Sequence, residues 1–280
     1  SLRKTKTDKV DARTIALMLM SDVNLKSYSD TSYHNEELKS LTRYRFRKVQ
    51  ERAQLRQSVS RLVTILFPEL EKLVPSLHIA SIYALLSEFP SAGTIASCHL
   101  THLTKRLENA SKGRYSREKA IEIRNAARAS IGSNMPAKSL ELKHTLRLIG
   151  ELDSEISEIE SEIKRIMDEI HSPILTIPGI GYRMGAMILA YAGASPSTYQ
   201  SGQMESSYSH MEKRGSRYLR FALINATKYV CQWDETFGAY LQKKISEGKH
   251  YNVAITHAAK KLVRLIYAME KSGKPYIKTA

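Results

Sequence analysis

The feature that most constrains the fold is a run of apolar residues that recur every three or four positions from Leu142 to Ile170. This spacing predicts one long helix with an apolar stripe of the coiled-coil kind. Between positions 151 and 169 the chain carries eight acidic residues against two basic ones. Such a helix would repel nucleic acid. It suits pairing with another helix, as a dimerisation element or as a spacer within the chain.

A second long helix is predicted from about Asn35 to Phe67, where apolar residues recur at similar intervals until Pro68 ends the pattern. Basic side chains on several of its faces form a candidate surface for phosphate backbones. The alternative is a solvated face with no partner. The candidate nucleic-acid-binding residues are Arg43, Arg45, Arg47, Lys48, Arg52 and Arg56.

The net charge favours the nucleic-acid interpretation. Among 280 residues, 43 Lys and Arg against 28 Asp and Glu give +15, and the pI is about 9.7. A chain of this charge is expected to bind a polyanion. Residues 201–280 alone contain 14 basic and 6 acidic side chains, so the C-terminal part shares this expectation.

Composition excludes several other classes. With 42% hydrophobic and 25% charged residues the chain is not disordered, and its length suits about two domains. No apolar run reaches the roughly 18 residues of a membrane span, and the N-terminus lacks a signal peptide's apolar core. Cys98 and Cys231 are too few for a disulfide framework and lack zinc-site spacing. We therefore expect a cytoplasmic chain with reduced thiols and no membrane partner.

An apolar segment at 174–193 contains the sequence Ile-Pro-Gly-Ile-Gly before a predicted apolar helix. This pattern resembles a helix-hairpin-helix element, in which Gly179 and Gly181 would let backbone N–H groups approach a phosphate regardless of base sequence. The alternative is a plain tight turn between core helices.

A basic amphipathic helix is predicted after a polar loop that begins near Ser195. A last helix is predicted from about Val253 to Lys271, with its apolar residues on one face and Lys260, Lys261 and Arg264 largely on another. The candidate nucleic-acid-binding residues at the start of the first of these helices are Lys213, Arg214, Arg217 and Arg220.

Two carboxylates near the N-terminus, Asp8 and Asp11, are spaced to share one helix face and could form half of a Mg²⁺ site. Ser201, followed by Gly202, has a hydroxyl that could attack a phosphodiester if cations stabilise the developing charge. The ordinary interpretations are a helix-start charge pair and a loop serine. His210 is a conceivable proton carrier or an exposed loop histidine.

Five motifs taken in order carry a resemblance: KTDKVDA, IPGIGYRMGAMILA, YAGASPSTYQSGQ, SHMEKRGSRYLRFAL and HAAKKLVRLIYAMEKSGKPY. Together they resemble the Piv/MooV-type DEDD transposases, the insertion sequence 110 family. The resemblance implies a RuvC-like α/β domain of RNase H type whose four acidic residues bind Mg²⁺. It also implies a C-terminal domain that bears a serine nucleophile. Asp8 and Asp11 match the last two acids, and Ser201 matches the serine.

The resemblance further implies a recombinase whose strand exchange passes through a covalent serine–DNA link. A structured bridge RNA would pair with donor and target DNA and select both, while the protein holds the backbones. The acidic site of one subunit would act with the serine of another, in a dimer or tetramer. Such a protein is expected in the bacterial or archaeal cytoplasm, associated with the nucleoid.

Two departures from the family pattern matter. The first two acids of the family lie upstream of KTDKVDA, so most of the RuvC-like domain is expected to be absent from this sequence. The MILA-like and YAG-like motifs are fused before Tyr191, where relatives carry a further segment. The expected fold is therefore mainly α-helical. Its expected parts are 1–30 as a RuvC-like remnant, 31–137 as a basic helical linker domain, 138–172 as a coiled coil and 173–280 as a serine-bearing transposase domain.

Two alternatives to the recombinase remain open. The chain could be a non-catalytic nucleic-acid-binding and oligomerising protein, a remnant or a regulator without the complete acidic site. It could also be a junction-resolving nuclease that uses metal and water, in which case Ser201→Ala would leave cleavage intact.

Overall fold

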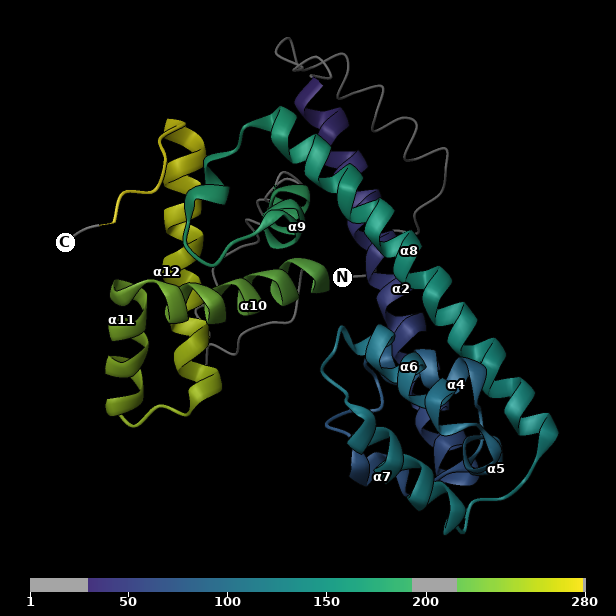
Figure 1. Ribbon diagram of the computed structural model, residues 1–280. Coiled ribbons are helices and arrows are strands. Elements are labelled where there is room, and N and C mark those ends of the chain that lie inside the picture. The colour runs from purple at the N-terminus through teal and green to yellow at the C-terminus, as the bar shows by residue number, and fades with distance from the viewer. Residues whose placement is uncertain (1–29, 193–215, 279–280) are drawn as a thin grey trace, which may run out of the picture. The chain divides into compact units, whose positions relative to one another are not determined.

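Helices make up the regular structure of the computed structural model, which describes residues 30–192 and 216–278. Within these ranges the chain forms eleven α-helices, one 3-10 helix and no strand (Figure 1). The prediction of a mainly α-helical fold is confirmed. The elements are α2 Asp30–Leu66, α3 Leu70–Leu73, α4 Ala80–Glu88, α5 Ala92–Ser97, α6 Leu100–Ser111, α7 Arg117–Arg128, α8 Pro136–Ile170, η1 Pro173–Thr176, α9 Tyr182–Ala192, α10 Arg217–Trp233, α11 Glu235–Ser246 and α12 Tyr251–Ser272.

The three helices that periodicity predicted most clearly are all present. The pattern from 35 to 67 corresponds to α2, the pattern from 142 to 170 to α8, and the pattern from 253 to 271 to α12. Pro68 follows α2 directly, as a residue that cannot continue a helix should. None of the helices in the described part of the chain has the length and apolar character needed to cross a membrane.

The chain divides into two compact units. One unit is Ser40–Arg165, and the other joins the residues before Ser40 to those after Arg165. Both long helices, α2 and α8, therefore contribute residues to each unit.

Most of the core of the unit 40–165 is one apolar cluster that draws on α2, the short helices α3 to α7, and the first half of α8. Figure 1 shows the short helices grouped around the C-terminal end of α2. Breaks between these helices are capped locally: Ser91 and Thr94 exchange backbone and side-chain hydrogen bonds at the start of α5. The largest fully buried side chains of this core are Phe67, Leu66, Leu70, Ile82, Leu85, Leu86, Ile95, Leu103, Leu107, Ile123 and Leu142.

The connection from α7 to α8 crosses the end of α2 at very short range. The Ser133 N–H donates to the Ile65 carbonyl at 2.8 Å, and a Cβ on Gly132 would lie 2.4 Å from the Leu66 carbonyl oxygen. The Glu69 carboxylate accepts hydrogen bonds from the Ser130 hydroxyl and the Ile131 N–H. Burial alone would raise the pKa of Glu69, but these hydrogen bonds outweigh it and lower the pKa.

The C-terminal helices α10 and α12 bury several alanines, namely Ala222, Ala226, Ala254, Ala258 and Ala259. Small residues allow helix backbones to approach closely. The first turn of α11 also packs closely on the end of α10, because a Cβ on Gly238 would lie 2.8 Å from the Cys231 carbonyl oxygen.

Asp234 ties the end of the chain to this group of helices. One carboxylate oxygen caps α11 by accepting the Phe237 N–H at 3.0 Å, and the other accepts the Tyr276 hydroxyl at 2.7 Å. The Tyr276 N–H donates to the Thr176 hydroxyl at 2.8 Å. Burial and the hydrogen bond to Asp234 raise the pKa of Tyr276 to about 12.

Candidate nucleic-acid interface

Three of the six predicted cations of α2 face acidic side chains of α8. The residue numbers of the cations rise along α2 while the numbers of the acids that they contact fall along α8. The two helices therefore run antiparallel here. The pairs are Arg45–Glu160 at 2.6 Å, Lys48–Glu155 at 2.6 Å and Arg52–Asp153.

The prediction that the acidic helix pairs with another helix is confirmed by these contacts, and the partner lies in the same chain. A coiled-coil supercoil and pairing with a second copy stay predictions. The three cations already have anionic partners, which any nucleic acid would have to displace.

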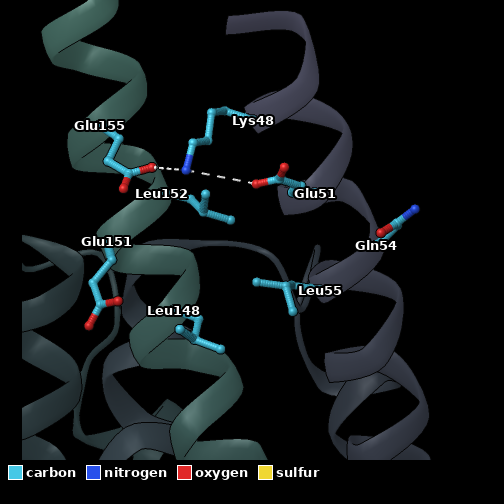
Figure 2. Close-up of a pocket in the computed structure, with 8 residues that line it drawn as sticks. All are labelled: Lys48, Glu51, Gln54, Leu55, Leu148, Glu151, Leu152 and Glu155. Carbon is cyan, nitrogen blue, oxygen red and sulfur yellow. Dashed lines mark ion pairs between the residues drawn. The ribbon is translucent and has the colours of Figure 1, made fainter. Parts of the chain in front are cut away.

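Figure 2 shows a hollow of about 360 Å³ between α2 and α8, with Lys48 reaching across it. Its ammonium lies 2.6 Å from Glu155 and 3.9 Å from Glu51. The contact with the Glu155 carboxylate raises the pKa of Lys48 against a smaller lowering by burial. Because this hollow contains one cation and three carboxylates, it is poorly suited to a phosphate. Its lining residues are Lys48, Glu51, Gln54, Leu55, Leu148, Glu151, Leu152 and Glu155.

The other three predicted cations of α2 differ in exposure. Arg43 and Arg47 are exposed, whereas Arg56 is half-buried. The Arg47 guanidinium lies 5.7 Å from the ring centroid of Tyr44, an exposed tyrosine on the same helix. On this helix, Arg43 and Arg47 are therefore the predicted residues best placed to meet a ligand.

The two glycines of the predicted hairpin have different surroundings. Gly179 has φ +89°, and a Cβ there would lie 2.7 Å from the Tyr229 carbonyl carbon and 2.9 Å from the Val230 nitrogen. The turn therefore packs directly on the backbone of α10, which accounts for this glycine without a phosphate. Gly181 is exposed, with open space where a Cβ would stand, and its carbonyl accepts the Gly185 N–H in the first turn of α9.

At the start of α10, Arg217 is exposed and supported by an aromatic pair. Its guanidinium lies 4.9 Å from the ring centroid of Tyr218 and donates to the Tyr218 hydroxyl at 3.0 Å. Tyr218 stacks on Tyr191 of α9 with ring centroids 5.5 Å apart. The hydrogen bond to Tyr218 raises the pKa of Arg217. Arg220 follows three positions later and is half-buried.

A second hollow, of about 380 Å³, lies between α11 and α12 and is lined by Tyr240, His257, Lys260, Lys261 and Arg264. No carboxylate contributes to its lining. The sequence placed the three α12 cations on a polar face but did not single them out as a site. The signal was their spacing at i, i+1 and i+4, which keeps them together on one side of a helix.

The predicted catalytic residues Asp8, Asp11 and Ser201 lie outside the described residues, as do Lys213, Arg214 and His210. Their predicted roles therefore stay predictions. In residues 30–192 and 216–278, no group of three or more His, Cys, Asp or Glu side chains could hold a metal ion. Both cysteines are free thiols, and burial raises the pKa of Cys231 to about 11.

Comparisons with known proteins match both ends of the chain. Residues 1–68 match the family model of DEDD transposases of the IS110 type, described as a transposase. Residues 182–242 match the model described as the transposase IS116/IS110/IS902 family.

One curated relative is the "insertion element IS110 uncharacterized 43.6 kDa protein" of Streptomyces coelicolor. It is 26% identical over 122 residues, which are 38% of this chain and 30% of that protein. The two family models match in order along the chain, so residues 1–68 and 182–242 are similar to transposases of the IS110 family.

Proposed function

We propose that the chain acts in a DNA transposase that cuts and rejoins DNA strands through a covalent link to Ser201. The observation that carries this proposal is the pair of family matches. Asp8 and Asp11 fall within the first matched range and Ser201 within the second. The basic helices support the proposal because they supply positive charge to a chain that would have to hold nucleic-acid backbones.

In this proposal the Ser201 hydroxyl oxygen attacks a backbone phosphorus atom. The serine–phosphorus bond forms as the bond from phosphorus to one strand's oxygen breaks, the hydroxyl proton passes to a base, and the departing oxygen keeps the electron pair. The hydroxyl oxygen of another strand then reverses the exchange and frees the serine. Arg217 and Arg220, which follow Ser201 in the same matched range, are suited to stabilise charge on the phosphate oxygens.

Mg²⁺ prefers oxygen ligands, and it is often bound by one or two carboxylates. The carboxylates of Asp8 and Asp11 therefore fit this ion. They would hold it together with further acids, since two carboxylates leave most of its coordination to other groups. When bound, the ion would supply positive charge next to the reacting phosphate.

The partners in this proposal are donor DNA, target DNA and a structured bridge RNA, with base pairing selecting the sequence. The working assembly is a dimer or tetramer. The proposed parts of the chain are 1–30, 31–137, 138–172 and 173–280, with the serine in the last.

A second candidate function is non-catalytic nucleic-acid binding. It is favoured by the exposed cations of α10 and α12, such as Arg217, Lys260 and Arg264, which could hold a nucleic-acid backbone without any strand chemistry.

The test of the proposal is a cell-based excision assay on the gene with its native flanking DNA. Junction formation is measured by amplification across the rejoined ends, and covalent protein–DNA adducts by denaturing gels. Ser201→Ala should abolish the adduct and the junctions, while Ser206→Ala in the same segment serves as the matched control.

Asp8→Asn and Asp11→Asn should each lower junction formation by about a hundredfold or more. Cleavage that survives Ser201→Ala without an adduct would instead support the metal-and-water nuclease. Absence of both cleavage and junctions in the unaltered protein, with DNA binding retained, would support the non-catalytic alternative.

A further inference from the structure

The hollow between α11 and α12 differs from an ordinary solvated patch because its cations have no counter-ion among the residues that the structure describes. The ion pairs described around α11 and α12 join Glu247 to Lys244 and Lys249, and Glu235 to Lys278. Within residues 30–192 and 216–278, no ion pair involves the three cations of the hollow. These are Lys260, Lys261 and Arg264.

One of these cations is held in place by aromatic rings. The Lys261 ammonium lies 5.2 Å from the ring centroid of Phe237 and 5.1 Å from that of Tyr240, both on α11. Phe237 is itself only 3% exposed, so the rings form a fixed support for the charge. A charge that is already positioned loses little conformational entropy when it meets an anion.

The remaining side chains of the hollow extend this charge along α12. Lys260 and Arg264 are exposed and one helical turn apart. Tyr267 follows on the same side of α12 and is 68% exposed. Cations in a row with an exposed aromatic ring are typical of surfaces that follow a nucleic-acid backbone.

We propose that the α11–α12 hollow binds the phosphodiester backbone of a nucleic acid. Lys260 and Arg264 contact successive phosphates from the rim, and Lys261 supplies positive charge at the floor. An arginine can donate two parallel hydrogen bonds to one phosphate, whereas the lysines act as point charges. The site rests on the proposed function only in its choice of ligand, since binding does not require the serine chemistry.

The cations of this site lie outside the two segments that the family models match. All three are on α12, beyond residue 242, where the second family match ends. The charge of this part of the chain supports a nucleic acid over a smaller anion, because the described residues 216–278 carry 12 basic against 4 acidic side chains. A single small anion would neutralise little of this excess.

The test is the salt dependence of binding by the full 280-residue chain. The probes are a fluorescein-labelled 25-base-pair DNA duplex of random sequence and a labelled RNA hairpin, with anisotropy followed from 50 to 200 mM NaCl. The variant Lys260→Gln/Arg264→Gln removes two exposed charges and keeps Lys261 on its rings. The matched control, Lys138→Gln/Arg147→Gln, removes two charges that pair with glutamates of their own helix.

Each lost phosphate contact should lower the slope of log affinity against log salt by about 0.9 for duplex DNA. The site variant should therefore lose about 1.8 in slope and bind about tenfold or more weakly at low salt, while the control keeps the slope of the unaltered protein. Loss on only one probe assigns the hollow to that nucleic acid, and loss on both assigns it to backbones in general.

Equal slopes for the site variant and the unaltered protein on both probes would overturn the proposal, as would an equal loss in the control. Circular dichroism confirms that each variant keeps its helix content. Because no strand cutting is measured, failure of the Ser201 chemistry would leave this result intact, and failure here would leave the Ser201 chemistry untested.

Discussion

The α2–α8 pair and the C-terminal helices α9 to α12 keep neighbouring helices together in different ways. Across α2 and α8, long side chains of opposite charge meet, as in the Arg45–Glu160 pair. Among α9 to α12, small residues and glycines bring backbones close, as where Gly179 meets α10. The cations of α12 are then left on the outside, without carboxylates in the hollow that they line.

This difference shows why counting charges does not locate a binding surface. The α2 helix is the more basic in sequence, yet three of its cations are already matched by α8. The fewer cations of α12 are the more available ones. A phosphate recognises unmatched charge, so the shorter basic pattern is the better candidate.

The largest effect on stability is expected at Gly179, where close backbone packing coincides with a positive φ. Gly179→Ala would place a methyl group 2.7 Å from the Tyr229 carbonyl carbon at a positive φ. The strain and overpacking should lower the free energy of unfolding by about 2–4 kcal/mol. Gly181→Ala, where the space is open, should cost less than about 1 kcal/mol. Urea unfolding followed by circular dichroism measures both, and equal losses would show that the turn does not pack on α10 as described.

The next largest effect is expected on DNA binding, when the acids of α8 that pair with the cations of α2 are neutralised. The triple variant Asp153→Asn/Glu155→Gln/Glu160→Gln should free three aligned cations and strengthen binding of duplex DNA by about tenfold or more at low salt, with a steeper salt slope.

The matched control is Glu122→Gln/Glu141→Gln/Glu162→Gln, which adds the same charge but frees scattered cations. A gain of the same size in the control would mean that net charge alone governs binding. The comparison between the two helix pairs would then fail.

A smaller effect is expected at the tie between the chain end and α11. Tyr276→Phe removes the hydrogen bond to Asp234 and should lower the free energy of unfolding by about 1 kcal/mol near neutral pH. Since the folded-state pKa of about 12 lies above the ordinary tyrosine pKa of 10.0, this stability is fully present below pH 10 and is lost as the pH rises toward 12. Unfolding of both proteins across this range should therefore show their difference shrinking, and a constant difference would contradict the assignment.

The smallest effect on the free energy of unfolding is expected at His78 in the unit 40–165. Its pH dependence is opposite to that expected for Tyr276. Burial lowers the pKa of His78, assisted by the nearby charge of Arg56, while its ring contacts Ser60 and Tyr83. A histidine with a lowered folded-state pKa contributes stability that is present above its ordinary pKa and is lost as the pH falls through the folded-state value.

In His78→Gln the free energy of unfolding should therefore fall less steeply between about pH 7 and pH 5 than in the unaltered protein. Tyr276→Phe serves as the control, because its pH dependence on the acid side should equal that of the unaltered protein. An unchanged slope in His78→Gln would show that other groups account for the acid sensitivity.

Periodicity predicted the long helices because each carries one continuous apolar stripe. It also predicted that α8 pairs with a helix, from acidic side chains that would repel nucleic acid. It did not identify α2 as the partner, since a stripe shows which face is buried and not what covers it. The same limit applies to Gly179, whose neighbour on α10 lies about fifty residues away in sequence.

The candidate site was predictable to a lesser degree. The roles of Asp8, Asp11 and Ser201 came from the resemblance, because two carboxylates and a loop serine are common by chance. The α11–α12 hollow needed the structure, since Tyr240 and Lys261 come together only through the packing of two helices. Ion pairing between basic and acidic residues of different helices depends on tertiary packing. The spacing of residues along one helix does not predict it.

The hydrogen bond from the Tyr276 N–H to the Thr176 hydroxyl has a consequence for how this part of the chain could be joined to other sequence. The two residues stand 100 positions apart, yet their atoms are 2.8 Å from one another. A region whose first and last residues are adjacent can be inserted into a host chain, or circularly permuted, without stretching what lies on either side. The positions Thr176 and Tyr276 are therefore two neighbouring points at which other sequence could be joined to this part of the chain.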